Sequence, residues 1–385
     1  MRFTNKALKS NFLSTCERLR EGQLILRTPE GERYHFGNSG PEAEMVIRDW
    51  AVVSAMAAHG QVGLGETYVQ GMWDTSSIET LMTVAMRNRD HLGAYDHANP
   101  FNKARFRLAD TILRANSKRG ARKNIRSHYD VGNEFYGLWL DEGMTYSSGI
   151  FDHASDDLSR AQTRKNARIL SRLGEGERTL EIGCGWGGFA EQAAEDGRRV
   201  TGVTISRNQH SYAECRLDGR ADIQLRDYRD INGKYDNIVS IEMIEAVGAR
   251  YWPSYFSVLK QNLAEGGRVL LQAITVKDSF FETYKTSSDY IRQYVFPGGM
   301  LLSDRVIEAQ ANAAGLRVCD SFGFGQDYAK TCRIWAGRLA AQKRRISEMG
   351  HGEGFFRNWQ YYLEICAASF AVEHTNVVQV ELGHA

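Results

Sequence analysis

The pattern of apolar positions predicts alternating strands and helices through most of the second half of the chain. Short apolar runs that favour strands lie at 179–182, 199–205, 222–225, 236–241 and 268–275. Segments with helical spacing lie before and between them, at 159–173, 188–196, 207–217 and 252–264. This alternation predicts an α/β fold, in which a Rossmann-like parallel sheet carries helices on both faces. The segments 315–321 and 328–339 are expected to add strands at the sheet edge, the second becoming helical at its end.

A smaller α+β unit is predicted over residues 1–100. Residues 23–27 and 33–36 have strand character, and the loop between them has the turn chemistry of a hairpin. Apolar residues at helical spacing predict helices over 41–58 and 76–87. A glycine-punctuated stretch, 63–74, lies between them.

Residues 101–126 change the character of the chain and form a basic linker. The segment contains nine lysines and arginines but a single acid, Asp110, and apolar residues are interleaved with them. Such a basic amphipathic segment favours an anionic membrane surface, at about 1 kcal/mol per cation near the bilayer. A solvated linker helix explains the charges equally well. Nucleic acid is disfavoured because no aromatic platform or recognition motif accompanies the charges.

Residues 278–300 interrupt the strand–helix alternation with a dense group of aromatic side chains, closed by the motif Phe-Pro-Gly-Gly at 296–299. Because the insertion follows a predicted strand end, we interpret it as a lid or an apolar acyl tunnel. The alternative is ordinary packing of an inserted helix.

The stretch 179–190 carries the strongest chemical signal, a strand followed by a glycine turn and the start of a helix. Gly183, Gly185 and Gly188 fit the dinucleotide fingerprint G-x-G-x-x-G. A nicotinamide enzyme also needs an acid at the end of the next strand, but that strand ends in Thr204-Ile205-Ser206. Glu181, just before the glycines, suits a small cationic cofactor such as S-adenosylmethionine. A tight turn without a ligand is the remaining alternative.

Composition sets the class of protein. The 385 residues are 42% hydrophobic and 25% charged, as in soluble globular proteins, and the net charge of +1 gives no nucleic-acid signal. The six cysteines form no CxxC pair, so we expect a reduced cytoplasmic setting without a metal site. The N-terminal region is too polar for a signal-peptide core, and the longest apolar run, 50–58, is too short to span a bilayer. Any membrane contact is therefore expected to be peripheral.

Several separated motifs resemble the cyclopropane-fatty-acyl-phospholipid synthases and their methyltransferase relatives. They occur in the family's order, densely after about residue 121, at 63–74, 128–133, 146–147, 181–190, 203–206 with Gln209, 227–230 and 296–299. The resemblance implies a class I methyltransferase sheet in residues 127–385. It also implies an N-terminal lipid-interaction domain in residues 1–100.

The resemblance also implies a cofactor site for S-adenosylmethionine. Gly183 and Gly185 match the glycines beside the methionine part of the cofactor, and Tyr146 and Ser147 match the portal over it. Gln209 matches the residue at the ribose or adenine end, where other enzymes use an acid. Tyr228 and Arg229 match the adenine-side pair.

A catalytic centre that holds bicarbonate as general base is implied too. Glu245, Tyr328 and the backbone of Ile274 match members of its cradle. Two positions depart from the family, because Ser148 stands where a cysteine is usual and Gln272 where a histidine is usual. An amide cannot titrate near pH 7 as histidine does, although it still donates hydrogen bonds.

The activity implied by the resemblance is methyl or methylene transfer to cis double bonds in membrane phospholipid acyl chains, through a carbocation. Cyclopropane closure and a methyl-branched or methylene product both stay open. A non-catalytic paralogue that binds cofactor and lipid, and a nicotinamide oxidoreductase, are the alternatives. The resemblance further implies a homodimer at the inner face of the membrane.

Overall fold

The computed structural model describes residues 2–92, 131–153 and 155–385, which form two compact units. The first unit comprises Met1–Leu113, Thr283–Val295 and Cys332–His374, and the second comprises Arg114–Glu282, Phe296–Thr331 and Thr375–Ala385. The first unit therefore takes in two later segments that the expected division at residue 100 did not include. The basic linker 101–126 and residues 128–130 of the motif 128–133 lie outside the described residues, so the predictions for them stay predictions.

The sheet of the first unit confirms the predicted hairpin. Its strands are β1 (Gly22–Arg27), β2 (Arg33–Ser39), β3 (Glu42–Ile47) and β4 (Trp73–Asp74), in the order β2-β1-β3-β4. Strands β1 and β2 pair antiparallel up to Arg27 opposite Arg33, and the loop between them contains Gly31 with a φ of 86°. A positive φ of this size is a conformation that glycine adopts without steric cost.

The helix predicted over 41–58 is wrong in its first part. Residues 42–47 form β3, which pairs parallel with β1 and buries every second side chain, Ala43, Met45 and Ile47. This period of two is that of a strand and outweighs the apolar spacing read over the longer window. The remaining helices from the N-terminal part are α1 (Arg2–Cys16), α2 (Ala51–His59), α3 (Gln61–Val69), α4 (Ile78–Arg87) and α5 (Arg89–Leu92).

Later segments complete the first unit. They include the π-helix η5 (Ile291–Val295), α16 (Lys343–Glu348) and α17 (Glu353–Ala371). Tyr290 is buried, stacks edge-on against Tyr361 at 4.8 Å and donates to Asn358 Oδ1 at 2.5 Å. A Cβ added to Gly65 would lie 2.3 Å from its ring. Tyr290 is thus a packing residue, while the lid function of the insertion stays a prediction.

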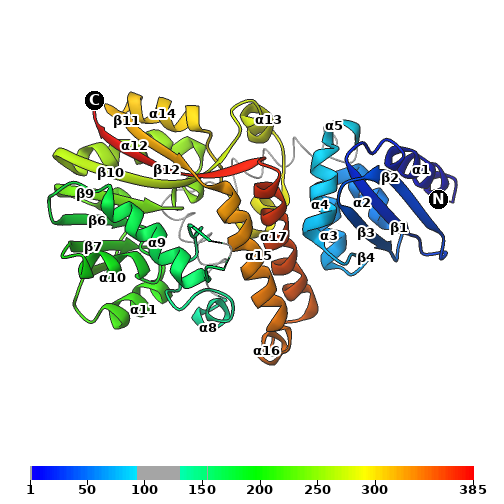
Figure 1. Ribbon diagram of the computed structural model, residues 1–385, viewed down its shortest axis with the longest axis horizontal. Coiled ribbons are helices and arrows are strands. Elements are labelled where there is room, and N and C mark those ends of the chain that lie inside the picture. The colour runs from blue at the N-terminus through cyan, green and yellow to red at the C-terminus, as the bar shows by residue number, and fades with distance from the viewer. Residues whose placement is uncertain (1, 93–130, 154) are drawn as a thin grey trace. The chain divides into compact units, whose positions relative to one another are not determined.

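The second unit contains the predicted α/β sheet (Figure 1). Its seven strands lie in the order β11-β12-β10-β9-β6-β7-β8. The five strands from β8 to β10 run parallel, and β12 runs antiparallel to both of its neighbours. Their bounds are β6 (Arg178–Ile182), β7 (Arg199–Thr204), β8 (Asp222–Leu225), β9 (Tyr235–Ile241), β10 (Leu263–Val276), β11 (Leu316–Gly323) and β12 (Thr375–His384). The order reverses between β6 and β9, where open α/β sheets bind their ligands.

Helices cover both faces of this sheet. α9 (Leu158–Ser171), α10 (Gly188–Glu195) and α11 (Arg207–Leu217) enclose one apolar cluster with Val239 and Leu270. On α12 (Trp252–Asn262), the fully buried Tyr255 lies close to Ser240, which alternates with Val239 and so points to the opposite face. The other elements are α8 (Asn133–Gly137), α13 (Phe281–Thr286), α14 (Asp304–Ala313) and short 3₁₀ turns at Tyr228–Asp230, Ile244–Ala246 and Ala249–Tyr251.

The strand predicted over 328–339 is wrong, since α15 spans Gly325–Ala341. Its buried side chains recur at helical spacing, at Tyr328, Cys332, Trp335 and Leu339. The sheet position beside β10 belongs instead to β12, which the sequence pattern did not reveal. The edge strand predicted at 315–321 is confirmed as β11.

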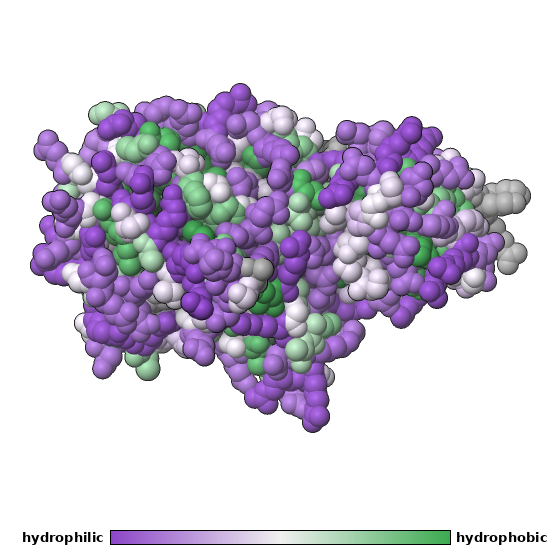
Figure 2. All heavy atoms as spheres, in the orientation of Figure 1, coloured by the Kyte–Doolittle hydropathy of each residue, from purple (hydrophilic) through white to green (hydrophobic). Residues whose placement is uncertain are grey.

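The surface is mainly polar, as Figure 2 shows for one face. Over the described residues the large hydrophobic side chains that are exposed are Leu225, Tyr294 and Phe322. None of the helices in the described ranges has the length and apolar character needed to cross a bilayer.

Asn88 provides a test of the first unit. Its side chain is fully buried, accepts from the backbone N–H groups of Arg20 and Glu21, and donates to two carbonyl oxygens. We expect Asn88→Ala to lower the free energy of unfolding by about 2–4 kcal/mol, because the substitution leaves buried backbone groups without their hydrogen-bond partner. Asn38→Ala, at an exposed position, is the control and should change it by less than about 0.5 kcal/mol. Equal effects of the two substitutions in urea titrations would contradict the structural role assigned to Asn88.

Candidate active site

The glycine turn joins β6 to α10 and leaves space for a ligand. Gly183 and Gly185 have φ values of 84° and 53°, and the amides of Gly183 and Cys184 both donate to Val203 O. A Cβ on Gly183 would lie 2.8 Å from Met243 Cγ, whereas one on Gly185 would meet nothing within 4 Å. The turn is thus fixed on one side and open on the other, next to the start of α10, the kind of place where a helix can bind an anionic or polar group.

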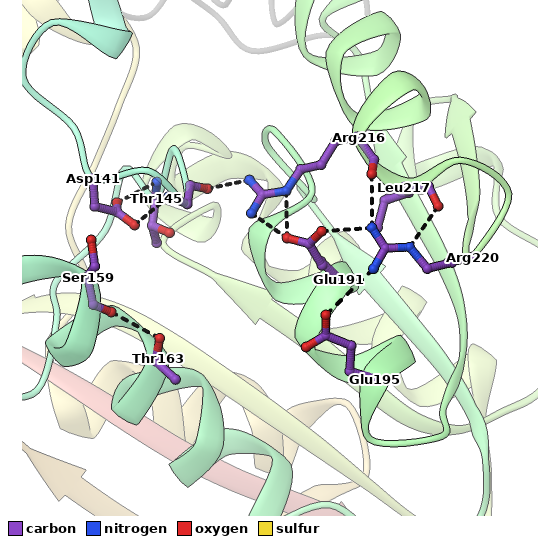
Figure 3. Close-up of polar contacts among 10 residues, drawn as sticks. Asp141, Thr145, Ser159, Thr163, Glu191, Glu195, Arg216, Leu217 and Arg220 are labelled. Carbon is purple, nitrogen blue, oxygen red and sulfur yellow. Dashed lines mark hydrogen bonds and ion pairs between the residues drawn. The ribbon is translucent and has the colours of Figure 1, made fainter.

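The Arg216 side chain holds the loop that leads to the predicted portal (Figure 3). Arg216 of α11 donates to Gly143 O at 2.7 Å and pairs with Glu191 of α10, which also binds Arg220. Asp141 accepts from the backbone amides of Gly143 and Thr145. The loop is therefore tied directly to α11 and, through the Arg216–Glu191 pair, to α10, the helix that follows the glycine turn.

The predicted portal residues Tyr146 and Ser147 are held by neighbouring side chains. The ring of Tyr146 contacts those of Tyr136 and Trp139 at 5.6 and 5.4 Å. Ser147 is buried, and its hydroxyl accepts from Lys165 Nζ at 3.1 Å. Burial lowers the pKa of Lys165 to about 8, although Glu242, Asp141 and Glu181 oppose this.

The residues predicted for the adenosine end lie at the next two strand ends. Gln209 is buried in the first turn of α11, and its carbonyl oxygen accepts from the Thr204 hydroxyl at 2.9 Å. Arg229 forms a two-pronged pair with buried Asp227 at 2.8 and 2.7 Å and lies over the ring of Tyr228. The Asp227 pairing raises the pKa of Arg229, which keeps the guanidinium charged and fixed.

A separate group gathers where β9 and β10 meet α15, and it contains all five residues of the predicted catalytic set. Glu245 Oε1 accepts from the Ile274 amide at 2.5 Å, and Glu245 O accepts from the Met300 amide at 2.8 Å. Within the described ranges, Glu245 Oε2 has no hydrogen-bond partner. Burial and then the charge of Glu242 raise the pKa of Glu245 to about 8.

Glu242 is a further candidate site residue, which the sequence analysis missed. Its Oε1 accepts from the Ser148 amide at 2.9 Å and from Gln272 Nε2 at 2.8 Å, and its Oε2 accepts from the Tyr328 hydroxyl. Its φ of 49° is uncommon for a residue with a side chain, and the three hydrogen bonds to the carboxylate hold the residue in this conformation. The Ser148 hydroxyl, by contrast, donates to Gly149 O. Ser148 thus binds Glu242 through its backbone amide and not through its hydroxyl.

A chain of side chains fixes the orientation of Gln272. Arg168 Nη1 donates to Gln379 Oε1 at 2.7 Å, and Gln379 Nε2 donates to Gln272 Oε1 at 2.9 Å. Gln272 and Gln379 are direct partners in the antiparallel register of β10 and β12. The carbonyl of Gln272 is occupied, so its amide nitrogen is the atom that faces Glu242.

Hydrogen-bond roles indicate the charge states of the two glutamates. Three donors point at the oxygens of Glu242, which suits an ionised carboxylate because that group only accepts. Burial still raises its pKa. Glu245 has the weaker set of donors and, with a pKa of about 8, is mostly protonated at neutral pH. Both side chains are half-buried rather than sealed in the core.

The arrangement suits a small cationic cofactor beside an acidic reaction site. Glu181, under the glycine turn, is fully enclosed, and burial raises its pKa to about 8. Its Oε2 has no hydrogen-bond partner in the described part of the chain. Strand β7 ends without the acid that a nicotinamide dinucleotide requires. Fold and site together define a class I S-adenosylmethionine-dependent methyltransferase.

Comparison with known proteins gives the family. The family model for mycolic acid cyclopropane synthetase matches residues 116–380. The tuberculostearic acid methyltransferase UfaA1 of Mycobacterium tuberculosis is 35% identical over 92% of this chain and 87% of its own. The cyclopropane-fatty-acyl-phospholipid synthase of Escherichia coli is 33% identical over 89% and 88%. The chain belongs to this cyclopropane synthase family.

A solved structure supports the same family. The mycolic acid cyclopropane synthase CmaA1, complexed with SAH and CTAB, is 28% identical and covers 68% of this chain and 97% of its own, with a TM-score of 0.64. The predicted family, enzyme class and cofactor S-adenosylmethionine are confirmed, and the nicotinamide alternative is excluded.

The close packing of Gly183 predicts an effect on cofactor binding. Gly183→Ala should weaken S-adenosylhomocysteine binding at least about tenfold, or roughly 1.4 kcal/mol, because the Cβ would displace the turn from Met243. Gly197→Ala is a matched control, since its φ of 83° imposes the same backbone cost and its Cβ would meet nothing within 4 Å. Calorimetry should show unchanged affinity for the control.

The raised pKa of Glu245 predicts a pH effect on stability. Between its ordinary value of 4.5 and about 8 the folded protein holds a proton that the unfolded chain has lost, so unfolding free energy falls as pH rises. Glu245→Gln has no carboxyl group at this position to titrate, so it does not lose unfolding free energy in this way. The variant should therefore gain stability relative to the parent as pH is raised from 5 to 8 in urea titrations. A constant difference would show that Glu245 is ionised throughout.

Proposed function

We propose that the protein transfers a methyl or methylene group from S-adenosylmethionine to the cis double bond of unsaturated acyl chains in membrane phospholipids. The observation that carries the proposal is the pair Glu242 and Glu245, held by Gln272, Ile274 and Tyr328 beside the cofactor turn. Relatives support it, because two of them are named for a fatty-acyl-phospholipid synthase and a tuberculostearic acid methyltransferase.

The chemistry requires a pocket that tolerates a cation. Bound S-adenosylmethionine supplies an electrophilic methyl group. The alkene π electrons form the new carbon–carbon bond, the S–C electron pair stays on sulfur, and a carbocation remains on the acyl chain. Fixed negative charge on Glu242 stabilises this cation, and holding the reactants in place supplies much of the acceleration. Loss of a proton then ends the reaction.

The proton that leaves determines the product. Loss from the new methyl group closes a cyclopropane, whereas loss that forms a carbon–carbon double bond gives a methyl-branched or methylene alkene. Because Ser148 and Gln272 replace the usual cysteine and histidine of the implied centre, we propose the second outcome.

The setting follows from the same proposal. We propose that the protein meets its substrate as a peripheral protein at the cytoplasmic face of the membrane, as a homodimer, without nucleic acid as a partner. The basic linker 101–126 supports attraction to anionic headgroups. The dimer is carried over from the family resemblance.

The direct test is turnover with defined lipid. Purified protein and labelled S-adenosylmethionine should convert vesicles of a monounsaturated anionic phospholipid into a product that gains one carbon. Gas chromatography–mass spectrometry and proton NMR then separate a cyclopropane ring from an alkene. Cyclopropane acids alone would contradict the proposed product. Tight cofactor binding without turnover on any unsaturated phospholipid would support a non-catalytic paralogue instead.

Glu245→Gln tests the acidic site within this assay. We expect turnover to fall by at least about 100-fold, a typical effect of removing a positioned acid or base, while S-adenosylhomocysteine affinity stays within about twofold. Thermal unfolding serves as the control. If stability and cofactor affinity fall together with turnover, Glu245 is a structural carboxyl.

A further inference from the structure

The residues present do not fit the bicarbonate ion that the family resemblance implies. Such an ion needs hydrogen-bond donors around it. Of the matching groups, the Ser148 amide, Gln272 Nε2 and the Tyr328 hydroxyl already donate to Glu242. The Ile274 amide already donates to Glu245. Each group of the implied cradle thus already donates a hydrogen bond to a carboxyl group of the chain itself.

Charge also opposes a separate anion at this place. Glu242 and Glu245 interact strongly enough for the charge of one to raise the pKa of the other. The nearby cation, Lys165, is shared among Glu242, Asp141 and Glu181. A free anion beside the Glu242 carboxylate would meet like-charge repulsion, which burial strengthens by lowering the dielectric.

We propose that the carboxylate of Glu242 takes the place of bicarbonate and is the general base that removes the proton from the cationic acyl chain. This inference rests on the proposed function. It assigns the base to a residue on the turn after β9, three positions before the glutamate that the family resemblance implies.

The step balances without a co-reactant. The C–H bond on the carbon next to the cationic carbon breaks, and its electron pair forms the π bond of the alkene product. The proton goes to a carboxylate oxygen of Glu242, which becomes a neutral acid and returns the proton to solvent between turnovers. Gln272 and Tyr328 act as positioning residues, since their hydrogen bonds aim the carboxylate.

Substitution of Glu242 separates the internal base from an external one. Glu242→Gln keeps the shape and removes the base, so turnover should fall at least about 100-fold. Glu242→Gly removes the side chain and frees the donors of Ser148, Gln272 and Tyr328. Its turnover should be restored in part by added bicarbonate, whereas the parent should be indifferent to bicarbonate. Glu364→Gln, a glutamate in the first unit that caps the Glu79 amide, is the matched control and should keep full activity.

A second readout needs no turnover. Carbon-13 NMR of labelled bicarbonate with protein saturated in S-adenosylhomocysteine should show bound anion for Glu242→Gly and none for the parent. Bound anion in the parent, bicarbonate-dependent turnover of the parent, or Glu242→Gln turnover within about threefold of the parent would each overturn the proposal. If the parent is inactive on all unsaturated lipids, the proposed function is wrong. The NMR result then still decides whether Glu242 fills the anion site.

Discussion

The hydrogen bonds to Glu242 are the constraint on which the reaction site depends. One carboxylate joins the loop at Ser148, strand β10 through Gln272 and helix α15 through Tyr328. Each of these donors would lose a partner if the carboxylate were absent, and unpaired buried donors are costly. The backbone of Glu242 takes a positive φ to bring its side chain to this point. The cost of that conformation is acceptable because three separate elements fix the carboxylate.

The cofactor end and the reaction end meet different electrostatic surroundings. At the glycine turn, an enclosed Glu181 and the dipole-bearing start of α10 flank the space left open at Gly185. At the reaction end, the carboxyl groups come from the turn after β9. Lys165 lies between these regions, bonded to Ser147, and balances acids from both. The Glu242 carboxylate therefore favours positive charge at the reaction end, where it develops on the acyl chain once the methyl group has left sulfur.

Sequence patterns predicted what depends on local periodicity or on a matched motif. The alternating sheet, the hairpin at Gly31, the glycine turn and Glu245 all fall in this class. Glu242 was missed because a single acid after a strand has no pattern of its own, and the family resemblance places the glutamate three residues later. Gln379 reaches Gln272 through strand register across 107 positions, which no local window contains. The segments 42–47 and 328–339 were misjudged because their apolar residues fit more than one period over short windows.

The position of β12 in the sheet has a consequence for the order of folding. It lies between β10 and β11, although it follows both in the chain. A nascent chain that has already made β11 has no place to dock it until β12 emerges, and pairing over such separations is slow. The same late strand carries Gln379, which orients Gln272 toward Glu242. Gln272 is therefore oriented toward Glu242 only after β12 has been synthesised and has paired with β10, so the arrangement of the acidic cluster is completed late in folding.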